Sequence, residues 1–135
     1  MKPTEGKSLT ALLLIAHGSR HADANADLDC LAAELRRAGD HDIVEPSFLE
    51  LAEPTIDQAA EKCVQQGADR VILVPYFLSA GVHVQRDLRA ALKRLNGRFS
   101  SVKFCLAKPL GPDPRLLDII RDRVAEVASE ARPSG

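Results

Sequence analysis

The chain has 135 residues, the size of one ordinary domain, so we expect a single hydrophobic core. Its 18 Lys and Arg residues are balanced by 19 Asp and Glu residues, and the net charge of −1 offers no basic surface for nucleic acid. Aromatic side chains make up 4% of the chain, which also argues against a surface on which bases stack. The longest apolar run, Ala11 to Ala16, is far shorter than the roughly 18 residues of a membrane helix. We therefore expect neither nucleic acid nor a membrane as a partner.

The three cysteines, Cys30, Cys63 and Cys105, lie far apart and form no C-x-x-C motif. An odd number of such cysteines is typical of reduced thiols and not of a disulfide framework, so we expect a cytoplasmic protein. Each cysteine is interpreted as a small side chain of the core.

The first half of the chain contains two apolar runs of strand length, each followed by a segment of helical periodicity. We expect the first strand at residues 9–16, with both faces buried, and the first helix at residues 23–38. The second strand is expected at residues 43–49. Glu53 and Pro54 are expected to open the second helix, because an acidic side chain and a proline both suit a first turn.

The second half repeats the alternation. The third strand is expected at residues 70–77, near the centre of the sheet, and a loop at residues 78–83 leads into the third helix. The fourth strand is expected at residues 102–107, before a turn at residues 110–114. The last helix follows this turn and has apolar side chains at helical spacing, namely Leu117, Ile120, Val124 and Val127.

This fourfold alternation favours an α/β fold, a three-layer sandwich in which helices flank a four-stranded parallel sheet. We expect a flexible leader at residues 1–8, one domain at residues 9–128 and a tail at residues 129–135.

Polar residues follow the strands at the edge where an open parallel sheet binds its ligands. His17 follows the first strand, Glu50 follows the second, and His83 ends the loop after the third. Imidazole binds divalent cobalt, nickel, iron and zinc, and a carboxylate can complete such a site or accept a proton. The chain has no H-x-x-x-H spacing, so the residues alone leave two interpretations open, metal ligands or histidines that cap strand ends.

Other polar residues in these loops also have more than one interpretation. Arg20, Arg86 and Arg89 could form a solvated face or bind an anionic ligand, because arginine contacts carboxylates in a bidentate geometry. Ser19 and Ser79 lack the G-x-S-x-G sequence of a nucleophile elbow and are interpreted as turn residues. No glycine-rich phosphate-binding motif follows any of the strands.

Four loop motifs occur in order along the chain: HGSR at residues 17–20, SFLE at 47–50 followed by Pro54, PYFLSAGVH at 75–83 with Asp87 beyond it, and LGPDP at 110–114. Together they resemble the loops of the CbiX-type sirohydrochlorin chelatases, a branch of the class II tetrapyrrole chelatases. The resemblance covers about residues 11–127.

The resemblance implies insertion of a divalent metal into a sirohydrochlorin-like tetrapyrrole without ATP, in cobalamin or sirohaem biosynthesis. On this model His17 and His83 hold the incoming metal and help to remove the pyrrole protons, and Glu50 is a supporting acid. Metallation removes two N–H protons while the metal exchanges its ligands, so a few imidazoles suit it better than a closed cage. The metal, with Co²⁺ favoured over Fe²⁺ or Ni²⁺, is a substrate, and no permanently bound cofactor is implied.

The carboxylates and the flat ring of such a substrate suggest further binding residues, namely Arg20, Ser79, Gly81, Arg86 and Leu110. Some relatives carry a histidine after the fourth strand where this chain has Asp113, which leaves a third metal ligand from this turn open.

Two other functions are alternatives to a chelatase, a carrier and a histidine phosphatase. The same fold could serve a non-catalytic carrier of metal or tetrapyrrole, because a fold does not establish a function. A histidine phosphatase would place an arginine immediately before the histidine of the first loop, where this chain has Ala16.

The length also bears on assembly. Members of the wider chelatase family commonly use two similar α/β halves around a cleft, and this chain supplies one. The resemblance therefore implies a homodimer with two-fold symmetry, in which the second copy supplies the missing half.

Overall fold

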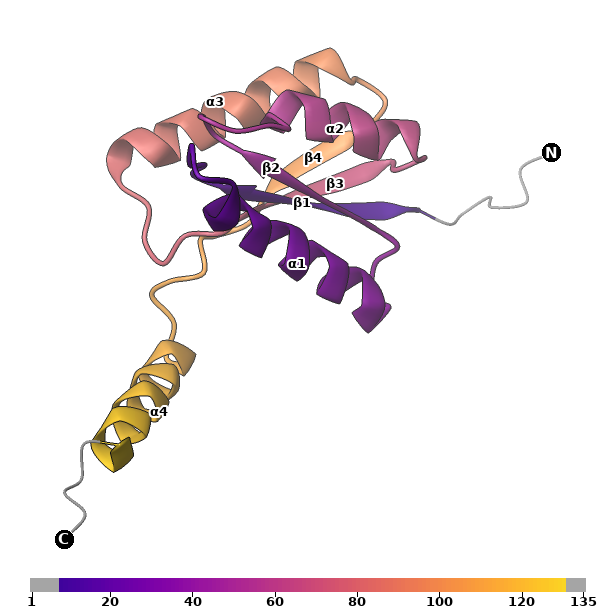
Figure 1. Ribbon diagram of the computed structural model, residues 1–135. Coiled ribbons are helices and arrows are strands. Elements are labelled where there is room, and N and C mark those ends of the chain that lie inside the picture. The colour runs from indigo at the N-terminus through magenta and orange to yellow at the C-terminus, as the bar shows by residue number, and fades with distance from the viewer. Residues whose placement is uncertain (1–7, 131–135) are drawn as a thin grey trace, which may run out of the picture.

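The computed structural model describes residues 8–130, in which four parallel strands form one sheet in the order β2–β1–β3–β4 (Figure 1). The strands are β1 (Thr10–Ala16), β2 (Ile43–Phe48), β3 (Arg70–Pro75) and β4 (Lys103–Leu106). The helices are α1 (Ala22–Ala38), α2 (Ile56–Gln65), α3 (Val82–Arg98) and α4 (Arg115–Glu130). The α/β class, the parallel sheet and the alternation of strand and helix are thus confirmed. The expected leader at residues 1–8 and tail at residues 129–135 lie mostly outside the described residues.

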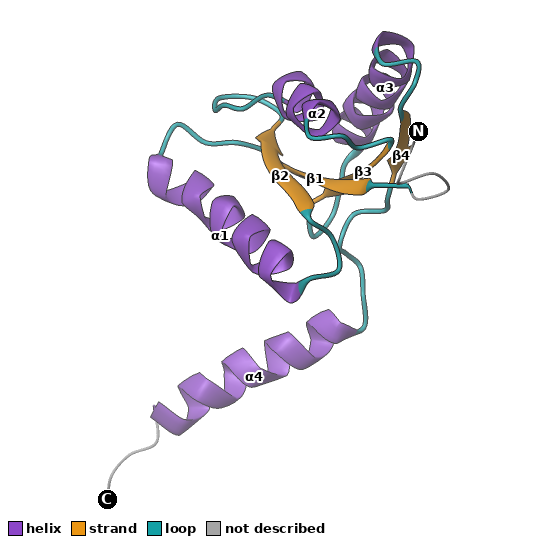
Figure 2. Cartoon of the chain, turned by 90° about the vertical axis from the view of Figure 1, so that its right-hand side faces the viewer, coloured by secondary structure: helices purple, strands orange, loops and turns teal. Residues whose placement is uncertain are grey.

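The core forms on both faces of the sheet, and Figure 2 shows α1 on one face with α2 and α3 on the other. Apolar side chains from β1 and β3, such as Leu13 and Leu73, pack with Leu88 and Leu95 of α3 on the second face. On the first face, Leu28 of α1 packs with the sheet in a smaller cluster. Burial on both faces explains why β1 is a nearly continuous apolar run.

The start of α2 differs from the expected one. The helix begins at Ile56 instead of at Glu53 and Pro54, which lie in the preceding loop. Thr55 is the N-cap: its hydroxyl accepts a hydrogen bond from the Gln58 amide, and the Gln58 side chain accepts one from the Thr55 amide. This capping box provides partners for two amide groups that the first turn leaves free, so it fixes the start of the helix. The interpretation of Glu53 as a first-turn acid is therefore wrong, and Asp57 has that place.

The structure also differs from the sequence-based prediction around β3 and α3 and at the cysteines. β3 ends at Pro75, two residues early, and α3 begins at Val82, so His83 lies in the first turn of a helix and not at the end of a loop. The cysteines differ in their surroundings, because Cys63 is buried, Cys105 is partly buried and Cys30 is exposed. The interpretation of Cys30 as a core residue is wrong.

The last helix departs most from a regular sandwich. α4 extends away from the sheet beyond α1 (Figures 1 and 2). Its apolar side chains keep the expected helical spacing, and they are exposed to solvent. No described helix has the length and apolar character needed to cross a bilayer.

Candidate functional site

The site begins where β1 and β2 end side by side. The hydrogen-bond ladder between them continues past the strands, because the Leu49 amide donates to the Ala16 carbonyl and the Glu50 amide donates to the His17 carbonyl at 3.1 Å. The register that pairs Ala16 with Phe48 would place Leu49 opposite His17. The bond from the Glu50 amide to the His17 carbonyl, one residue further on, brings Glu50 beside His17.

A glycine makes this close approach possible. Gly18 has a φ of 103°, in the left-handed region, and a Cβ at this position would overlap with the carbonyl oxygen of Glu50. Only glycine fits both the backbone conformation and the space, so the G of the HGSR motif has a structural role beside the histidine.

The two side chains are in direct contact. His17 Nε2 lies 2.9 Å from Glu50 Oε2, and the side chains are 56% and 58% exposed. A carboxylate at Nε2 favours the tautomer that carries its proton there, which leaves a lone pair on Nδ1. The pair thus orients the imidazole and presents a free nitrogen at the surface, as carboxylates do for histidines that bind metals.

His17 and Glu50 stand at the rim of a pocket of about 290 Å³ between α2 and α3. The pocket is lined by His17, Leu49, Glu50, Thr55, Ile56, Asp57, Val84, Asp87, Ala90, Ala91 and Arg94. The lining contains both polar and apolar side chains, and three of the lining residues, Glu50, Asp57 and Asp87, are carboxylates. The pocket can therefore hold a cationic group or a polar edge of a larger ligand beside the His17 imidazole.

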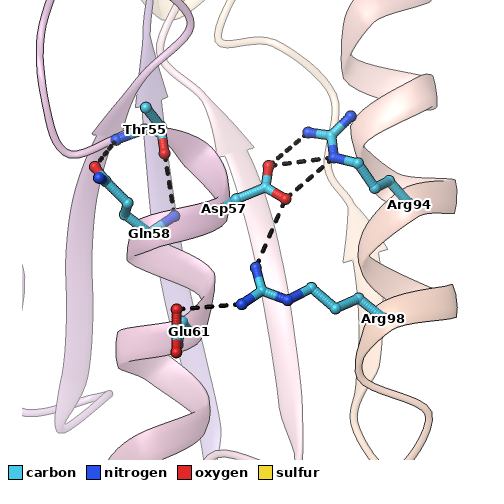
Figure 3. A network of polar contacts seen from close by, with 6 residues as sticks. All are labelled: Thr55, Asp57, Gln58, Glu61, Arg94 and Arg98. Atoms are coloured by element: carbon cyan, nitrogen blue, oxygen red, sulfur yellow. Dashed lines mark hydrogen bonds and ion pairs between the residues drawn. The ribbon is translucent and has the colours of Figure 1, made fainter.

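Two residues that line the pocket, Asp57 and Arg94, belong to a network of ion pairs between α2 and α3 (Figure 3). Arg94 of α3 donates to both carboxylate oxygens of Asp57 in α2, at 2.7 to 3.2 Å, and Arg98 lies 3.8 Å from the same carboxylate. The hydrogen bond from Arg94 holds the pKa of Asp57 below its usual value of 3.8. Arg98 also contacts Glu61, one turn further along α2. These contacts join the two helices that form the walls of the pocket.

His83 lies in the first turn of α3 and is exposed. Asp87 and Ala90, which line the pocket, follow it at the i+4 and i+7 positions and so share its side of the helix. His83 has no side-chain hydrogen-bond partner within residues 8–130. The structure therefore brings His17 and Glu50 together, and it places His83 on the same helix side as the pocket without joining it to them.

The other predicted residues lie around the same edge of the sheet without lining this pocket. Arg20 is exposed between β1 and α1, and Ser79 and Gly81 are exposed in the loop between β3 and α3. Arg86 is exposed on α3, and Leu110, which is 43% exposed, lies in the connection to α4.

Asp113 has a structural role in the turn before α4. Its carboxylate accepts hydrogen bonds from the Arg115 amide and guanidinium, at 2.8 to 2.9 Å. The side-chain hydrogen bonds from Arg115 lower the pKa of Asp113 to about 2. The residue is thus engaged at the start of the helix and does not point to a third ligand.

Sequence reasoning missed the ion pair beside the site. Asp57 and Arg94 are 37 positions apart, and only the packing of α2 on α3 makes them neighbours. Asp87 was visible as part of a motif, and its i+4 spacing from His83 was the signal that could have placed it on the pocket wall. Among the described residues, no group of three His, Cys, Asp or Glu side chains is arranged to hold a metal ion.

The fold and the site define an α/β protein with a histidine–carboxylate pair at the carboxyl edge of a parallel sheet. The CbiX family model matches residues 11–127, and the chain belongs to the CbiX family. It is 36% identical to the chloroplastic sirohydrochlorin ferrochelatase of Arabidopsis thaliana, with 87% of this chain and 52% of that protein covered. It is 37% identical to the sirohydrochlorin cobaltochelatase of Sulfurisphaera tokodaii, with 86% and 92% covered.

Two solved structures have the same fold as this chain. A CbiX protein of cobalamin (vitamin B12) biosynthesis from Marinobacter aquaeolei VT8 superposes with a TM-score of 0.78 at 33% identity, covering 90% of this chain and 99% of that one. SirB from Bacillus subtilis with Fe³⁺ gives a TM-score of 0.81 at 30% identity, covering 93% of this chain and 48% of that one. The chain thus spans about half the length of some relatives and nearly the full length of others.

Proposed function

We propose that this protein is a sirohydrochlorin chelatase, which inserts a divalent metal into the tetrapyrrole without ATP, in cobalamin or sirohaem biosynthesis. Membership of the CbiX family and the names of its cobaltochelatase and ferrochelatase relatives support the activity. The observation that carries the proposal is the contact of His17 with Glu50 at the rim of a polar pocket.

The reaction exchanges one divalent cation for two pyrrole N–H protons. His17 and His83 hold the incoming metal, since neutral imidazole binds Co²⁺, Fe²⁺ and Ni²⁺. Glu50 keeps the His17 ring in place and offsets the positive charge that the ring gains when it takes up a proton. The metal is a substrate in this scheme, with Co²⁺ favoured, and no permanently bound cofactor takes part.

The openness of the site suits a metal that must leave it. A closed structural site with four protein ligands holds its metal tightly, whereas a site with few ligands leaves positions for the substrate nitrogens. His17 is 56% exposed, so a flat macrocycle can reach the face of the ring.

The substrate is large and carries many carboxylates. We assign Arg20 and Arg86 to contact these groups, since both are exposed near the site and arginine binds carboxylates in a bidentate geometry. Ser79 and Gly81, in the loop between β3 and α3, and Leu110, in the connection to α4, are assigned to a hydrogen-bonding and apolar bed for the ring.

We further propose that the enzyme works in the cytoplasm and as a homodimer. The described residues contain three cysteines that are all free, which fits a reducing compartment. The family pattern of two α/β halves, of which this chain supplies one, supports the dimer.

The decisive test follows the absorption spectrum of sirohydrochlorin after metal is added to the purified protein. We expect His17→Ala and His83→Ala to lower the insertion rate by roughly 10²-fold or more, because each removes a metal ligand and a proton acceptor. His41→Ala is the matched control, because His41 lies between α1 and β2 at the opposite edge of the sheet.

The mechanism is refuted if both variants insert metal at the rate of the unaltered protein. Stoichiometric binding without turnover would indicate a carrier instead. Parallel rates with Co²⁺, Fe²⁺ and Ni²⁺ identify the preferred metal.

A further inference from the structure

One half of the sheet lacks a helix on the face that α1 covers. α1 packs against β1 and β2, and no other described helix covers β3 and β4 on this face (Figure 2). The side chains that alternate to this side are Ile72, Val74 and Cys105, and all three are partly exposed. Their neighbours on the opposite face, Leu73 and Phe104, are fully or almost fully buried. We call Ile72, Val74 and Cys105 the open strip.

An open strip of this kind is unusual for a parallel sheet. Such sheets occur almost only with both faces covered, because their strands are apolar on both sides. Within residues 8–130 this half of the face is therefore an apolar surface that a helix could cover.

α4 has the matching surface. Leu117, Ile120, Val124 and Val127 follow one another at the spacing of one helix face and are 52% to 62% exposed. We call these four residues the apolar stripe. Asp122 lies on the opposite side of the helix, so α4 is amphipathic. Within residues 8–130, α4 extends away from the sheet (Figures 1 and 2) and its apolar stripe is exposed.

The connection between β4 and α4 directs the helix away from its own sheet. The Leu110 and Gly111 amides both donate to the Phe77 carbonyl, at 3.0 and 3.3 Å. Gly111 lies so close to the backbone of Leu78 that a Cβ would overlap with its carbonyl oxygen. Only residues 112–114 separate Gly111, which these contacts hold in place, from the start of α4. Two of the three residues are prolines, whose φ is fixed.

We propose that the apolar stripe of α4 covers the open strip of a second copy of this chain, and that the two copies exchange their α4 helices reciprocally. Both surfaces are present on every copy, so a two-fold axis satisfies both at once. This inference concerns assembly and does not rest on the proposed activity.

The size of the contact fits a stable dimer. A helix of 16 residues is about 24 Å long, which exceeds the width of two neighbouring strands. Two such helices, each docked along one apolar side, bury roughly 2,000 Å² or more in total, within the range of obligate homodimers. SirB has as much chain again outside its match, since the match covers 48% of it, and here a second copy would supply that length.

Disulfide trapping tests the exchange, because Cys105 already lies in the open strip. Cys30→Ser first removes the exposed thiol; Cys63 stays, since its thiol is buried and burial raises its pKa to about 12. Ile120→Cys and Val124→Cys are then introduced separately in the stripe, with Asp122→Cys on the opposite side of the helix as the control. A disulfide forms only if the two Cα atoms come within about 7 Å.

After mild oxidation, we expect at least one stripe variant to run at twice the chain mass on a non-reducing gel, and the control to stay at the single-chain mass. Three results would overturn the proposal: loss of free thiols at single-chain mass, which places α4 on its own strip; equal linking of the Asp122→Cys control; or no link from either stripe variant. Circular dichroism checks that each variant is folded, and none of these measurements depends on chelatase activity.

Discussion

At the scale of single residues, the contact between His17 and Glu50 defines the geometry of the site. The backbone hydrogen bond brings Glu50 beside His17, and the carboxylate then orients the ring. In the proposed mechanism Glu50 is therefore a positioning residue for the imidazole, the group that we propose meets the metal.

We expect Glu50→Gln to lower the insertion rate by roughly 10- to 100-fold, because the amide cannot balance the charge of a protonated imidazole. Metal saturation curves at fixed sirohydrochlorin measure the effect, and the KM for the metal should rise together with the loss in kcat. Glu53→Gln is the matched control, since Glu53 is exposed in the same loop. Unchanged kinetics in Glu50→Gln would show that the contact has no part in the reaction.

Gly18, between His17 and Ser19, lies against the backbone of Glu50, and its replacement tests this close approach. Gly18→Ala forces a Cβ against the Glu50 carbonyl at a φ that alanine rarely adopts. We expect the free energy of unfolding to fall by roughly 2 kcal/mol, from strain and lost contacts.

Gly97→Ala is the control for this change, because Gly97 lies in α3 with open space around it. This variant should be neutral or more stable, by roughly 0.5–1 kcal/mol. Urea denaturation measures both values, and a Gly18→Ala variant as stable as the unaltered protein would contradict the close approach.

At the scale of elements, the ion pairs between α2 and α3 hold the pocket walls together. Asp57 has a lowered pKa, so the pair with Arg94 stabilises the fold at pH values above 3.8, the usual pKa of an aspartate. That stabilisation is lost as the pH falls through the lowered pKa of the folded state. Its size is roughly 0.5–1 kcal/mol, because the Asp57 side chain is 32% exposed.

We therefore expect Asp57→Asn to be less stable than the unaltered protein at pH 7 and to lose this deficit as the pH falls through the lowered pKa of Asp57. Asp118→Asn is the control, since Asp118 occupies the first turn of α4 and makes no ion pair among the described residues. Thermal unfolding over a series of pH values from 7 downward measures the difference. A deficit that stays constant with pH would exclude the ion pair as its cause.

Periodicity predicted the helices and strands well, because the apolar spacing of a helix or strand is a pattern among residues close together in the sequence. It placed the end of α1 at Ala38, and Gly39 has a φ of 88° in the left-handed conformation that ends helices. It missed the start of α2, where Pro54 suggested a first turn and the reciprocal hydrogen bonds of Thr55 and Gln58 decided it. Two plausible signals one residue apart can be separated only by the conformation of the loop.

At the scale of the whole molecule, the order of the strands brings the candidate residues to one edge. β1 lies between β2 and β3, so the segments after all three strands are neighbours, as the alternation of strand and helix indicated. The contact between His17 and Glu50 could not be predicted, because it depends on the register of β1 against β2. The Asp57–Arg94 pair depends in turn on how α2 packs on α3.

The position of α4 could not be predicted from the periodicity of the sequence either. The spacing of Ile120 and Val124 predicts an apolar side and says nothing about which surface will cover it. If α4 docks on a second copy as we propose, a chain of single-domain length carries an element whose partner surface belongs to another copy.

The hydrogen bonds that continue from the ends of β1 and β2 limit how far His17 and Glu50 can move apart. The amides of Leu49 and Glu50 donate to the Ala16 and His17 carbonyls, so this part of the site is held to the ends of β1 and β2. The loop before α3 is exposed and has no such ladder partner at Ser79 or Gly81 within the described chain. In the proposed reaction, we therefore expect the movement that admits the macrocycle and releases the product to take place on the His83 side, with His17 and Glu50 held in place.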